Sequence, residues 1–489
     1  MILGSTTCAH LCPQGETTIT ILHTNDIHAR YLPHEAPWVS ETPRPLIGGF
    51  ARLSEVMDSV RRGRPITVTL DAGDVMTGNP IADRLYRGAQ GGLLIELMNM
   101  IGYDAWSPGN HEFDISQENM RALVAVASFP SLAANLAESS GEQYHGTQPY
   151  TILSRGGLRI GVIGLISQRL SSLVLQRNLT GIRVHDPTAT LERWVKELDP
   201  VTDLLIVLTH QGYAADSVLA EESTGVDIIV GGHSHTRLRE PRLVNGVLIV
   251  QAGSYCESLG VLTVTVRDDR VSDFWGQLLP LWVTGPPRQS PVARLADSVR
   301  TVIDKEYGEV ILTLGHRWRK NDPEQRLLIA VTEAQRTAAS AEVAFMNRGG
   351  IRRDLEAGPV TRRDLYEAIP FRNVLGTFQL SGAELRDVLV YVLDRETDVV
   401  VTGLTADWRR TKEGGVELLR VMIGGAPMED DSAYRCTASD YFLSQFSRYC
   451  GREQPTAAYP RLTVFEAVEQ FLRQDGIQEQ VPPPGINRR

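Results

Sequence analysis

Cysteine is scarce in this chain, with five among 489 residues. No two of them form a CxxC pair, which excludes a zinc ribbon and a thioredoxin-type redox site. Cys436 and Cys450 are near enough in sequence to be bridged in an oxidising compartment, and a pair of buried thiols is an equal alternative. The cysteines therefore leave the compartment open.

Long apolar runs and an excess of positive charge are also absent. No apolar run is long enough to span a bilayer, so the sequence predicts no transmembrane segment. Residues 1–15 lack the basic and apolar segments of a secretory signal, so no intact export signal is visible. The net charge of −10 gives no general attraction to nucleic acid polymers or anionic membranes. An anionic substrate would need local attraction, which a metal centre could supply.

Short apolar runs recur from Thr17 to about Trp282, among them TITILHT, PITVTLDA and DLLIVLTH. Several are separated by segments such as FARLSEVMDSVRR and TLERWVKELD, whose apolar residues recur every three or four positions. Strands that alternate with helices predict a layered α/β domain with a largely buried sheet. In such sheets the chemistry collects in loops beyond the strand ends.

The composition changes at TGPPRQSP, residues 284–291, and the helical pattern PVARLADSVRTVIDKEYG follows. The second half mixes helical and strand patterns, and the chain ends in a Pro-rich stretch. We therefore expect an N-terminal tail over 1–16, a large α/β domain over 17–286, a linker helix over 287–307, a smaller mixed α/β domain over 308–475 and a disordered tail over 476–489.

Polar side chains gather where the predicted strands end. Six of the eleven histidines lie in the four stretches ILHTNDIH, SPGNHEFD, VLTHQG and VGGHSHT, and TLDAGD contributes a further aspartate. Taken singly, each has a plainer interpretation: a turn at Asp74, a hydrogen-bonded core histidine at His210, or a solvated loop at GNHEFD. Together they predict one site, with the candidate ligands Asp26, His28, Asp74, Asn110, His210, His233 and His235.

This set offers three carboxylate or amide oxygens, four imidazoles and no thiolate. It exceeds what one tetrahedral ion needs, and it fits two ions that share a bridging carboxylate. Mixed nitrogen and oxygen ligands favour Zn, Mn, Co or Fe over Ca, Mg or Cu(I). The sequence therefore predicts two divalent metal ions as cofactors.

The motifs DIH, GD, GNHE, a single His and GHSH, in this order, resemble those of the calcineurin-like metallophosphoesterases. HTNDIH together with GNHEFD is similar to the 5′-nucleotidase branch of that family, and the resemblance extends from about residue 18 to 470. It implies a four-layer α/β/β/α metallophosphoesterase domain, a linker helix and a C-terminal substrate-binding domain.

The resemblance implies two metal sites that share Asp74. One site would take Asp26, His28, Asp74 and His235, and the other would take Asp74, Asn110, His210 and His233.

The same resemblance implies that His111 stabilises charge at the phosphate and that Asp114 orients its ring. Glu112 is expected to be structural. The implied reaction is the hydrolysis of nucleoside 5′-phosphates to nucleoside and phosphate by attack of a metal-bound water. Since the metals and the substrate-binding residues fall on different domains, we expect the domains to rotate about the linker during turnover.

In the second domain, NRGGIR at 347–352 and PFRN at 370–373 resemble the family's Asn-Gly-Gly-Gly-Ile-Arg turn and Pro-Phe-Gly-Asn segment. The candidate substrate-binding residues are Arg352, Asn373 and Arg348. A guanidinium suits this role because it grips a phosphate through two bonds. The alternative is a surface arginine paired with Asp354 or Glu356.

The sequence departs from the family where two aromatic residues usually clamp the nucleobase. Asp398 stands near the first position, and the second lacks the family's Gly-Gly-Asp-Gly-Phe segment. Nearby aromatic residues either replace the clamp or form the core stripe of a helix: Tyr441, Phe442, Phe446 and Tyr449. Arg348 and Arg372 replace family glycines, which suggests a more anionic or smaller substrate.

Other functions stay open at this stage. The same two-metal chemistry could act on a nucleotide sugar, a 2′,3′-cyclic nucleotide or a thiosulfohydrolase-type sulfur substrate, and a non-enzymatic binding protein could reuse the scaffold. The expected partner is a small-molecule phosphate ester, and no oligomeric state follows from the sequence. The resemblance implies a periplasmic or extracellular location, with the cytoplasm as the alternative.

Overall fold

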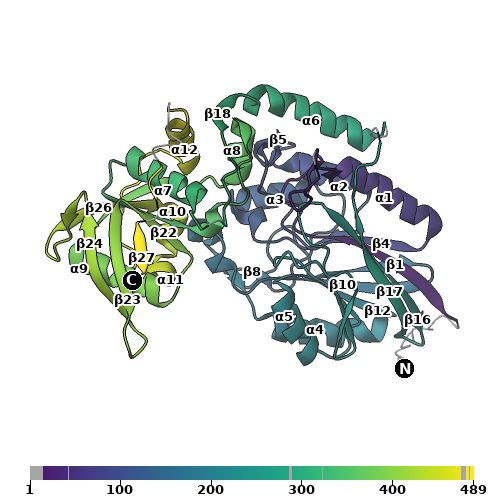
Figure 1. The fold of residues 1–489 in the computed structure, drawn as a ribbon. Coiled ribbons are helices and arrows are strands. Elements are labelled where there is room, and N and C mark those ends of the chain that lie inside the picture. The colour runs from purple at the N-terminus through teal and green to yellow at the C-terminus, as the bar shows by residue number, and fades with distance from the viewer. Residues whose placement is uncertain are drawn as a thin grey trace. The chain divides into compact units, whose positions relative to one another are not determined.

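The computed structural model describes residues 15–41, 43–285, 289–321, 323–474, 481–483 and 485–488. The chain divides into two compact units (Figure 1). Unit 1 comprises residues 1–77 and 81–301, and unit 2 comprises 78–80 and 302–489. Each unit has its own sheets and its own apolar core, so each is described by itself.

The first sheet of unit 1 has the strand order β17-β16-β1-β4-β7. Its strands are β1 (Thr17–Thr24), β4 (Thr67–Asp71), β7 (Ala105–Trp106), β16 (Ser258–Arg267) and β17 (Arg270–Pro280). β1, β4 and β7 run parallel to one another, whereas β16 is antiparallel to both β1 and β17. The three parallel strands therefore end at the same edge of the sheet.

The second sheet of unit 1 has the order β14-β15-β13-β12-β10-β9. Its strands are β9 (Tyr150–Arg155), β10 (Leu158–Ile166), β12 (Leu204–His210), β13 (Ile228–Val230), β14 (Arg242–Val244) and β15 (Val247–Val250). Four neighbouring strands run parallel, namely β10, β12, β13 and β15. The two edge strands, β9 and β14, pair antiparallel to β10 and β15.

The two sheets pack face to face because apolar residues alternate along their strands. In β12, Ile206 and Leu208 belong to the cluster that also contains Ile21 of β1 and Leu70 of β4. The intervening Leu205 and Val207 belong to a second cluster with the helices of the opposite face. Both faces of this sheet are therefore covered.

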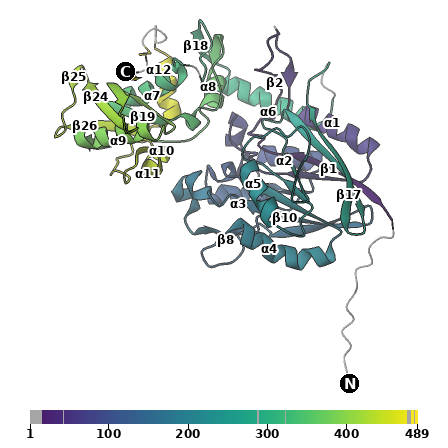
Figure 2. The same cartoon turned by 60° about the horizontal axis from the view of Figure 1, so that its bottom comes forward.

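Helices form the two outer layers of unit 1 (Figures 1 and 2). α4 (Pro187–Leu198) and α5 (Tyr213–Glu222) supply Leu191, Val195 and Leu219 to the outer cluster of the second sheet. α1 (Phe50–Gly63) and α2 (Gly92–Ile101) lie beside β1 in both views. The predicted α/β/β/α layering is confirmed.

The remaining elements that lie wholly or mainly in unit 1 are short. They are α3 (Gln117–Val126), the strand pairs β2 (His34–Glu35) with β3 (Leu46–Ile47), β5 (Leu85–Tyr86) with β6 (Ala89–Gln90) and β8 (Leu136–Glu138) with β11 (Ile182–Val184), and the 3₁₀ helices η1 (Pro80–Asp83), η2 (His111–Phe113), η3 (Leu170–Ser172), η4 (Gln176–Leu179) and η5 (Asp199–Val201).

α6 (Pro291–Tyr307) forms where the sequence predicts the linker helix, and the boundary between the two units falls within it. The Ser290 side chain accepts a hydrogen bond from the Ala293 amide at 3.0 Å and so satisfies one amide of the first turn.

The main sheet of unit 2 has the order β21-β26-β19-β22. Its strands are β19 (Val343–Asn347), β21 (Leu375–Ser381), β22 (Val399–Thr402) and β26 (Ala433–Ser439). The other elements are β18 (Val310–Leu314), β20 (Gly358–Thr361), β23 (Leu404–Arg410), β24 (Val416–Ile423), β25 (Ala426–Pro427), β27 (Ile486–Arg488), η6 (Arg348–Gly350), α7 (Arg326–Ala338), α8 (Arg362–Ala368), α9 (Gly382–Asp394), α10 (Asp440–Ser444), α11 (Phe446–Cys450) and α12 (Val464–Leu472).

Two observations bear on the ends of the chain and on the cysteines. The disordered tail expected over 476–489 is not what residues 486–488 form, because β27 pairs in parallel with β23. Ile486 packs against an apolar cluster of unit 2, which gives this segment a reason to be ordered. The expected tail over 1–16 falls almost wholly outside the described residues. Cys436 and Cys450 are buried and free.

No helix in the described part of the chain has both the length and the apolar character required to cross a membrane.

The layer between the two sheets should carry a large share of the stability of unit 1. Ile206 is fully buried there, so Ile206→Ala should lower the free energy of unfolding by about 2 to 5 kcal/mol. Val218 of α5 is 50% exposed, and Val218→Ala should change the free energy of unfolding by no more than about 0.5 kcal/mol. Guanidinium denaturation followed by circular dichroism measures both, and equal losses would contradict this account of the core.

Candidate metal centre

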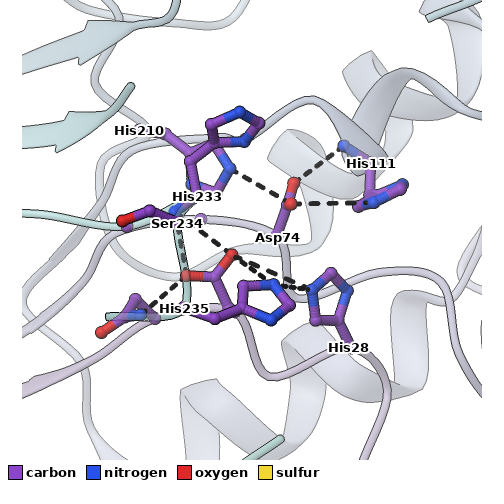
Figure 3. Close-up of polar contacts among 12 residues, drawn as sticks. His28, Asp74, His111, His210, His233, Ser234 and His235 are labelled. Atoms are coloured by element: carbon purple, nitrogen blue, oxygen red, sulfur yellow. Dashed lines mark hydrogen bonds and ion pairs between the residues drawn. The ribbon is translucent and has the colours of Figure 1, made fainter. Parts of the chain in front are cut away.

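Five strand ends of unit 1 supply the seven predicted ligands. Asp26 and His28 follow β1, Asp74 follows β4, Asn110 follows β7, His210 is the last residue of β12, and His233 and His235 follow β13. In Figure 3, dashed lines join Asp74 to His210 and His111, and His28, His233 and His235 lie nearby. The fold therefore brings together side chains that are far apart in the sequence.

Left-handed backbone is unusually frequent among these residues. Asp26, His28, Asp74, His233 and His235 all have φ between 50° and 75°. Residues other than glycine seldom adopt this conformation, and such strain clusters at functional sites. Hydrogen bonds between loops hold it in place, since the amides of Asp26 and His28 donate to the carbonyls of Gly73 (2.8 Å) and Asp74 (2.9 Å).

Asp26, His28 and His235 form one group of potential ligands. The Nε2 atoms of His28 and His235 are 2.9 Å apart, and His235 Nε2 is 3.4 Å from Asp26 Oδ1. Asp26 and His28 are buried, and His235 is partly exposed. The donor atoms of all three side chains thus point into one small volume.

Asp74, His210 and His233 form a second group. His210 Nε2 lies 3.1 Å from Asp74 Oδ2, and the ring centroids of His210 and His233 are 5.2 Å apart. A third group combines Asp74 with His28 and His111, so Asp74 lies in two of the three groups. His28 also lies in two groups, but of these two residues Asp74 is the one with a carboxylate, which can bridge two ions.

The hydrogen bonding of His210 fits a cation at this point. Its Nδ1 is 2.6 Å from the carbonyl of Ala72 and donates to it, so a neutral ring turns the Nε2 lone pair toward the Asp74 carboxylate. Two acceptors face each other at that distance only when a proton or a metal ion lies between them. Asn110 Oδ1 is buried and has no hydrogen-bond partner among the described residues. These donors fit a divalent metal ion.

The electrostatics of the group agree with its geometry. Burial opposes ionisation of Asp74, but His210 and His111 outweigh that effect and hold its pKa well below the usual range. Burial lowers the pKa of His210, yet the charge of Asp74 more than compensates and raises it to about 10. Burial lowers the pKa of His233 to about 4, so its neutral ring can offer a lone pair at pH 7.

His111 and Asp114 form the dyad expected from GNHEFD. His111 Nδ1 donates to Asp114 Oδ2 at 2.6 Å, and its Nε2 lies 3.8 Å from Asp74 Oδ2. The Thr77 hydroxyl donates to the same Asp114 oxygen at 2.6 Å. Thr77 was not predicted, and nothing in VMTG signals its role.

Two further buried residues, which the sequence does not single out, hold the loops that carry candidate ligands. Asn25 Nδ2 donates to Asp26 Oδ2 (2.7 Å) and to the carbonyl of Gly253 (2.6 Å). Gln251 Nε2 donates to the carbonyl of Gly232 (2.6 Å), while its Oε1 accepts from the amide of Thr236 (2.9 Å). The available signals were the position of Asn25 directly before Asp26 and that of Gln251 at the end of an apolar strand.

In unit 2 the guanidinium of Arg352 lies 5.9 Å from the ring centroid of Phe371. Asp354 and Glu356, the acids that could have neutralised it, pair with Arg317 at 2.7 and 3.2 Å. Among the described residues, no ion pair involves Arg352. Its positive charge is therefore available to an anion.

Arg348 has a different environment. Its Nη2 donates to Gln325 Oε1 at 2.7 Å, and its Nε lies 3.7 Å from Asp398 Oδ1. Asn373 is partly buried, and its carbonyl accepts from the amide of Val464 at 2.9 Å. Of the two arginines among the substrate-binding candidates, Arg352 is the one whose guanidinium forms no ion pair with a described residue.

The aromatic residues that follow β26 are divided between core and periphery. Phe442 and Phe446 are 0% and 1% exposed and belong to an apolar cluster of unit 2. Tyr449 is stacked on Phe442, with ring centroids 5.0 Å apart and planes 9° apart. Tyr441 is partly buried. Tyr449 is buried in the same cluster, so the helix-core interpretation holds for Phe442, Phe446 and Tyr449.

Comparison with known families agrees with the fold and the site. Residues 19–237 match the model of the calcineurin-like phosphoesterases, and residues 305–450 match that of the 5′-nucleotidase C-terminal domain. The chain belongs to the 5′-nucleotidase family of calcineurin-like metallophosphoesterases, which are hydrolases. Members of this class use divalent metal ions, and the groups described above could hold one.

Individual relatives carry the same designation. The chain is 26% identical to a 5′-nucleotidase of Vibrio cholerae, over 86% of this chain and 84% of that protein. It is 28% identical to a 5′-nucleotidase of Homo sapiens, over 78% and 73%. The crystal structure of a 5′-nucleotidase precursor from Thermus thermophilus matches with a TM-score of 0.83 and 25% identity, covering 96% of this chain and 99% of that one.

Proposed function

We propose that the protein is a two-metal hydrolase that converts nucleoside 5′-phosphates into nucleoside and phosphate. The observation that supports this most directly is the convergence of imidazoles from separate loops on the buried carboxylate of Asp74. The comparisons support the class of reaction and the type of substrate.

We assign the seven side chains to two cation sites that share Asp74. The first site is Asp26, His28, Asp74 and His235, and the second is Asp74, Asn110, His210 and His233. Each site offers at least two imidazoles together with carboxylate or amide oxygens, a set that suits Zn, Mn, Co or Fe.

Cations held by these residues around Asp74 would polarise the phosphoryl oxygens and would lower the pKa of a water molecule at the centre. His111 then stabilises the charge that develops on the phosphoryl or leaving oxygen, since its Nε2 faces the centre while Asp114 holds Nδ1. The Thr77 hydroxyl donates a second hydrogen bond to the same Asp114 oxygen and helps to fix the carboxylate. The dyad is thus oriented before substrate binds.

We assign substrate binding in unit 2 to Arg352, with Asn373 and Arg348 as further contacts. Arg352 is the strongest candidate because the nearby acids form ion pairs with Arg317 instead, namely Asp354 and Glu356. Its fork of donors suits a phosphate or another substrate anion.

We also propose a periplasmic or extracellular location, by resemblance to the family. Fractionation of the source cells with immunodetection tests it, and recovery only in the cytoplasmic fraction would overturn it.

Metal dependence gives the first test. With Mn²⁺, Zn²⁺ or Co²⁺ the wild-type protein should bind two ions per chain and release phosphate from nucleoside 5′-monophosphates, and a chelator should abolish turnover. Asp74→Asn should lose nearly all activity because it removes the shared charge, whereas Asp273→Asn, at an exposed position, should keep it.

Metal analysis and a phosphate-release assay across nucleotides, nucleotide sugars and 2′,3′-cyclic nucleotides measure these outcomes. A preference for another ester would keep the chemistry and replace the proposed substrate. Wild-type protein with neither bound metal nor esterase activity would refute the function.

The dyad gives a second test. His111→Asn should lower kcat roughly 100- to 1000-fold, since it removes one placed donor to the developing charge. Metal content should stay at the wild-type value, and His145→Asn, at an exposed histidine, should be silent. Steady-state kinetics with metal analysis checks this, and an unchanged kcat would remove His111 from the mechanism.

Arg352 gives a third test. Arg352→Met should raise KM about tenfold or more with little change in kcat, because a contact made equally in the ground and transition states is lost. Arg319→Met, at an exposed arginine, serves as the matched control. Equal KM values for the two variants would show that Arg352 does not hold the substrate.

A further inference from the structure

Glu112 is a fully buried acid between the loops that follow β4 and β7. Its side chain is not among the groups that could hold a metal, and the residue is 1% exposed. Its two oxygens accept four backbone hydrogen bonds, to Oε1 from Val75 (2.9 Å) and Met76 (3.0 Å) and to Oε2 from Gly109 (2.6 Å) and Asp74 (3.1 Å).

This pattern belongs to a carboxylate and to no neutral side chain of the same size. Each oxygen accepts from two N–H groups, so both oxygens act only as acceptors. Three of the donors are consecutive amides of the loop after β4, and they form a concave array that favours an anion. Without the carboxylate these buried amides would lack partners, and each would carry a desolvation cost.

The same contacts fix the conformation of Asp74. Its own amide is one of the four donors, and its backbone is left-handed at φ 56°. The carboxylate of Asp74 is held from the neighbouring loop, because the His111 amide donates to its Oδ1 at 2.8 Å. One short segment, Gly109–Glu112, thus holds both the backbone and the side chain of Asp74.

Close packing leaves Asp74 little room to adjust. A methyl group on Gly109 would lie 2.2 Å from Asp74 Oδ1 and 2.7 Å from His210 Cε1. Gly73 has φ 88°, and a methyl group there would lie 2.5 Å from the Gly109 nitrogen. The two loops are in direct contact, so the orientation of Asp74 depends on how Glu112 holds these loops together.

We infer that Glu112 is a positioning residue for the two-metal centre, which sets the orientation of Asp74 so that one carboxylate reaches both cation sites. It touches neither substrate nor metal, and the inference rests on the proposed two-metal function. Residues that orient metal ligands in this way typically change metal affinity or activity about 10- to 100-fold when they are replaced.

Burial and the neighbouring charge of Asp74 raise the pKa of Glu112 to about 7, whereas its backbone hydrogen bonds favour the ionised form. A second buried anion beside Asp74 is unfavourable by itself, because like charges repel strongly in a medium of low dielectric constant. An amide side chain could link the two loops without that repulsion, although it could not accept all four hydrogen bonds. Bound cations at Asp74 would offset the repulsion, so metal binding and the Glu112 contacts should stabilise each other.

Glu112→Gln tests the inference with almost no change in shape. The amide of glutamine keeps one acceptor oxygen and turns an NH₂ group toward two backbone donors. Glu112→Asp keeps both acceptor oxygens and the charge on a shorter side chain. Glu118→Gln, the same substitution at an exposed position of α3, is the matched control.

The measurements are Mn²⁺ and Zn²⁺ affinity by competition with a chelator, kcat and KM for the preferred nucleotide, and the melting temperature of the metal-free protein. In Glu112→Gln we expect affinity for the second ion to fall about 10- to 100-fold. At limiting metal, kcat should fall in parallel and KM should stay within about twofold. Excess metal should recover part of kcat, and Glu112→Asp should retain more affinity than Glu112→Gln.

Three results would overturn the inference. One is wild-type metal affinity in Glu112→Gln, and another is a loss no larger than that in Glu118→Gln. The third is a lowered melting temperature with unchanged metal affinity, which would reduce Glu112 to a purely structural residue. If Glu112→Gln does not fold, the comparison is made with Glu112→Asp. Failure of the two-metal function itself is distinguishable, because the wild-type protein would then bind no metal.

Discussion

The buried negative charge of Asp74 is the constraint on which the site depends. Its carboxylate is 2% exposed, and imidazoles from three loops face it. A charge that is removed from water is costly unless an opposite charge accompanies it. The histidines can supply that charge only while they are protonated, and ring nitrogens compete for protons when they crowd together. A divalent cation would resolve this conflict, because it would satisfy the carboxylate and the imidazole lone pairs at the same time.

The surrounding loops hold the carboxylate and the imidazoles close together. Left-handed backbone at five of the seven candidate ligands costs free energy, and only contacts made elsewhere can maintain it. Asn25, Gln251 and Glu112 make those contacts: each is almost fully buried, and each links a ligand loop to a neighbouring strand end or loop. The sheets provide the rigid base, since parallel strands deliver their carboxyl ends to one edge. The chemistry and the fold are therefore coupled through hydrogen bonds to backbone groups more than through apolar packing.

The sequence predicts the features that depend on local pattern. Alternating apolar residues indicate the sheets, and polar groups at strand ends indicate the set that the structure brings together around Asp74.

The sequence does not show contacts between distant segments. The sequence does not indicate a role for Thr77, because that role depends on Asp114 in another loop. Asp354 lies near Arg352 in the sequence, but in the structure it pairs with Arg317. The sequence predicts a disordered tail where strand β27 forms, because a Pro-rich composition says nothing about a partner strand far away in the chain. Local motifs specify which chemistry is possible, and long-range contacts decide which groups stay available for it.

The two arginines of the NRGGIR turn show how this distinction affects the substrate. Both carry the same charge, but Asp398 and Gln325 hold the guanidinium of Arg348, whereas that of Arg352 lies over Phe371. An ion pair adds directed polarity and almost no net charge, so Arg348 contributes less attraction to an anion than its sequence suggests. The idea of a more anionic substrate then depends mainly on the exposed Arg372. Within the described part of this turn, Arg352 is the arginine that no ion pair engages, and one such guanidinium can grip one phosphate group through two hydrogen bonds.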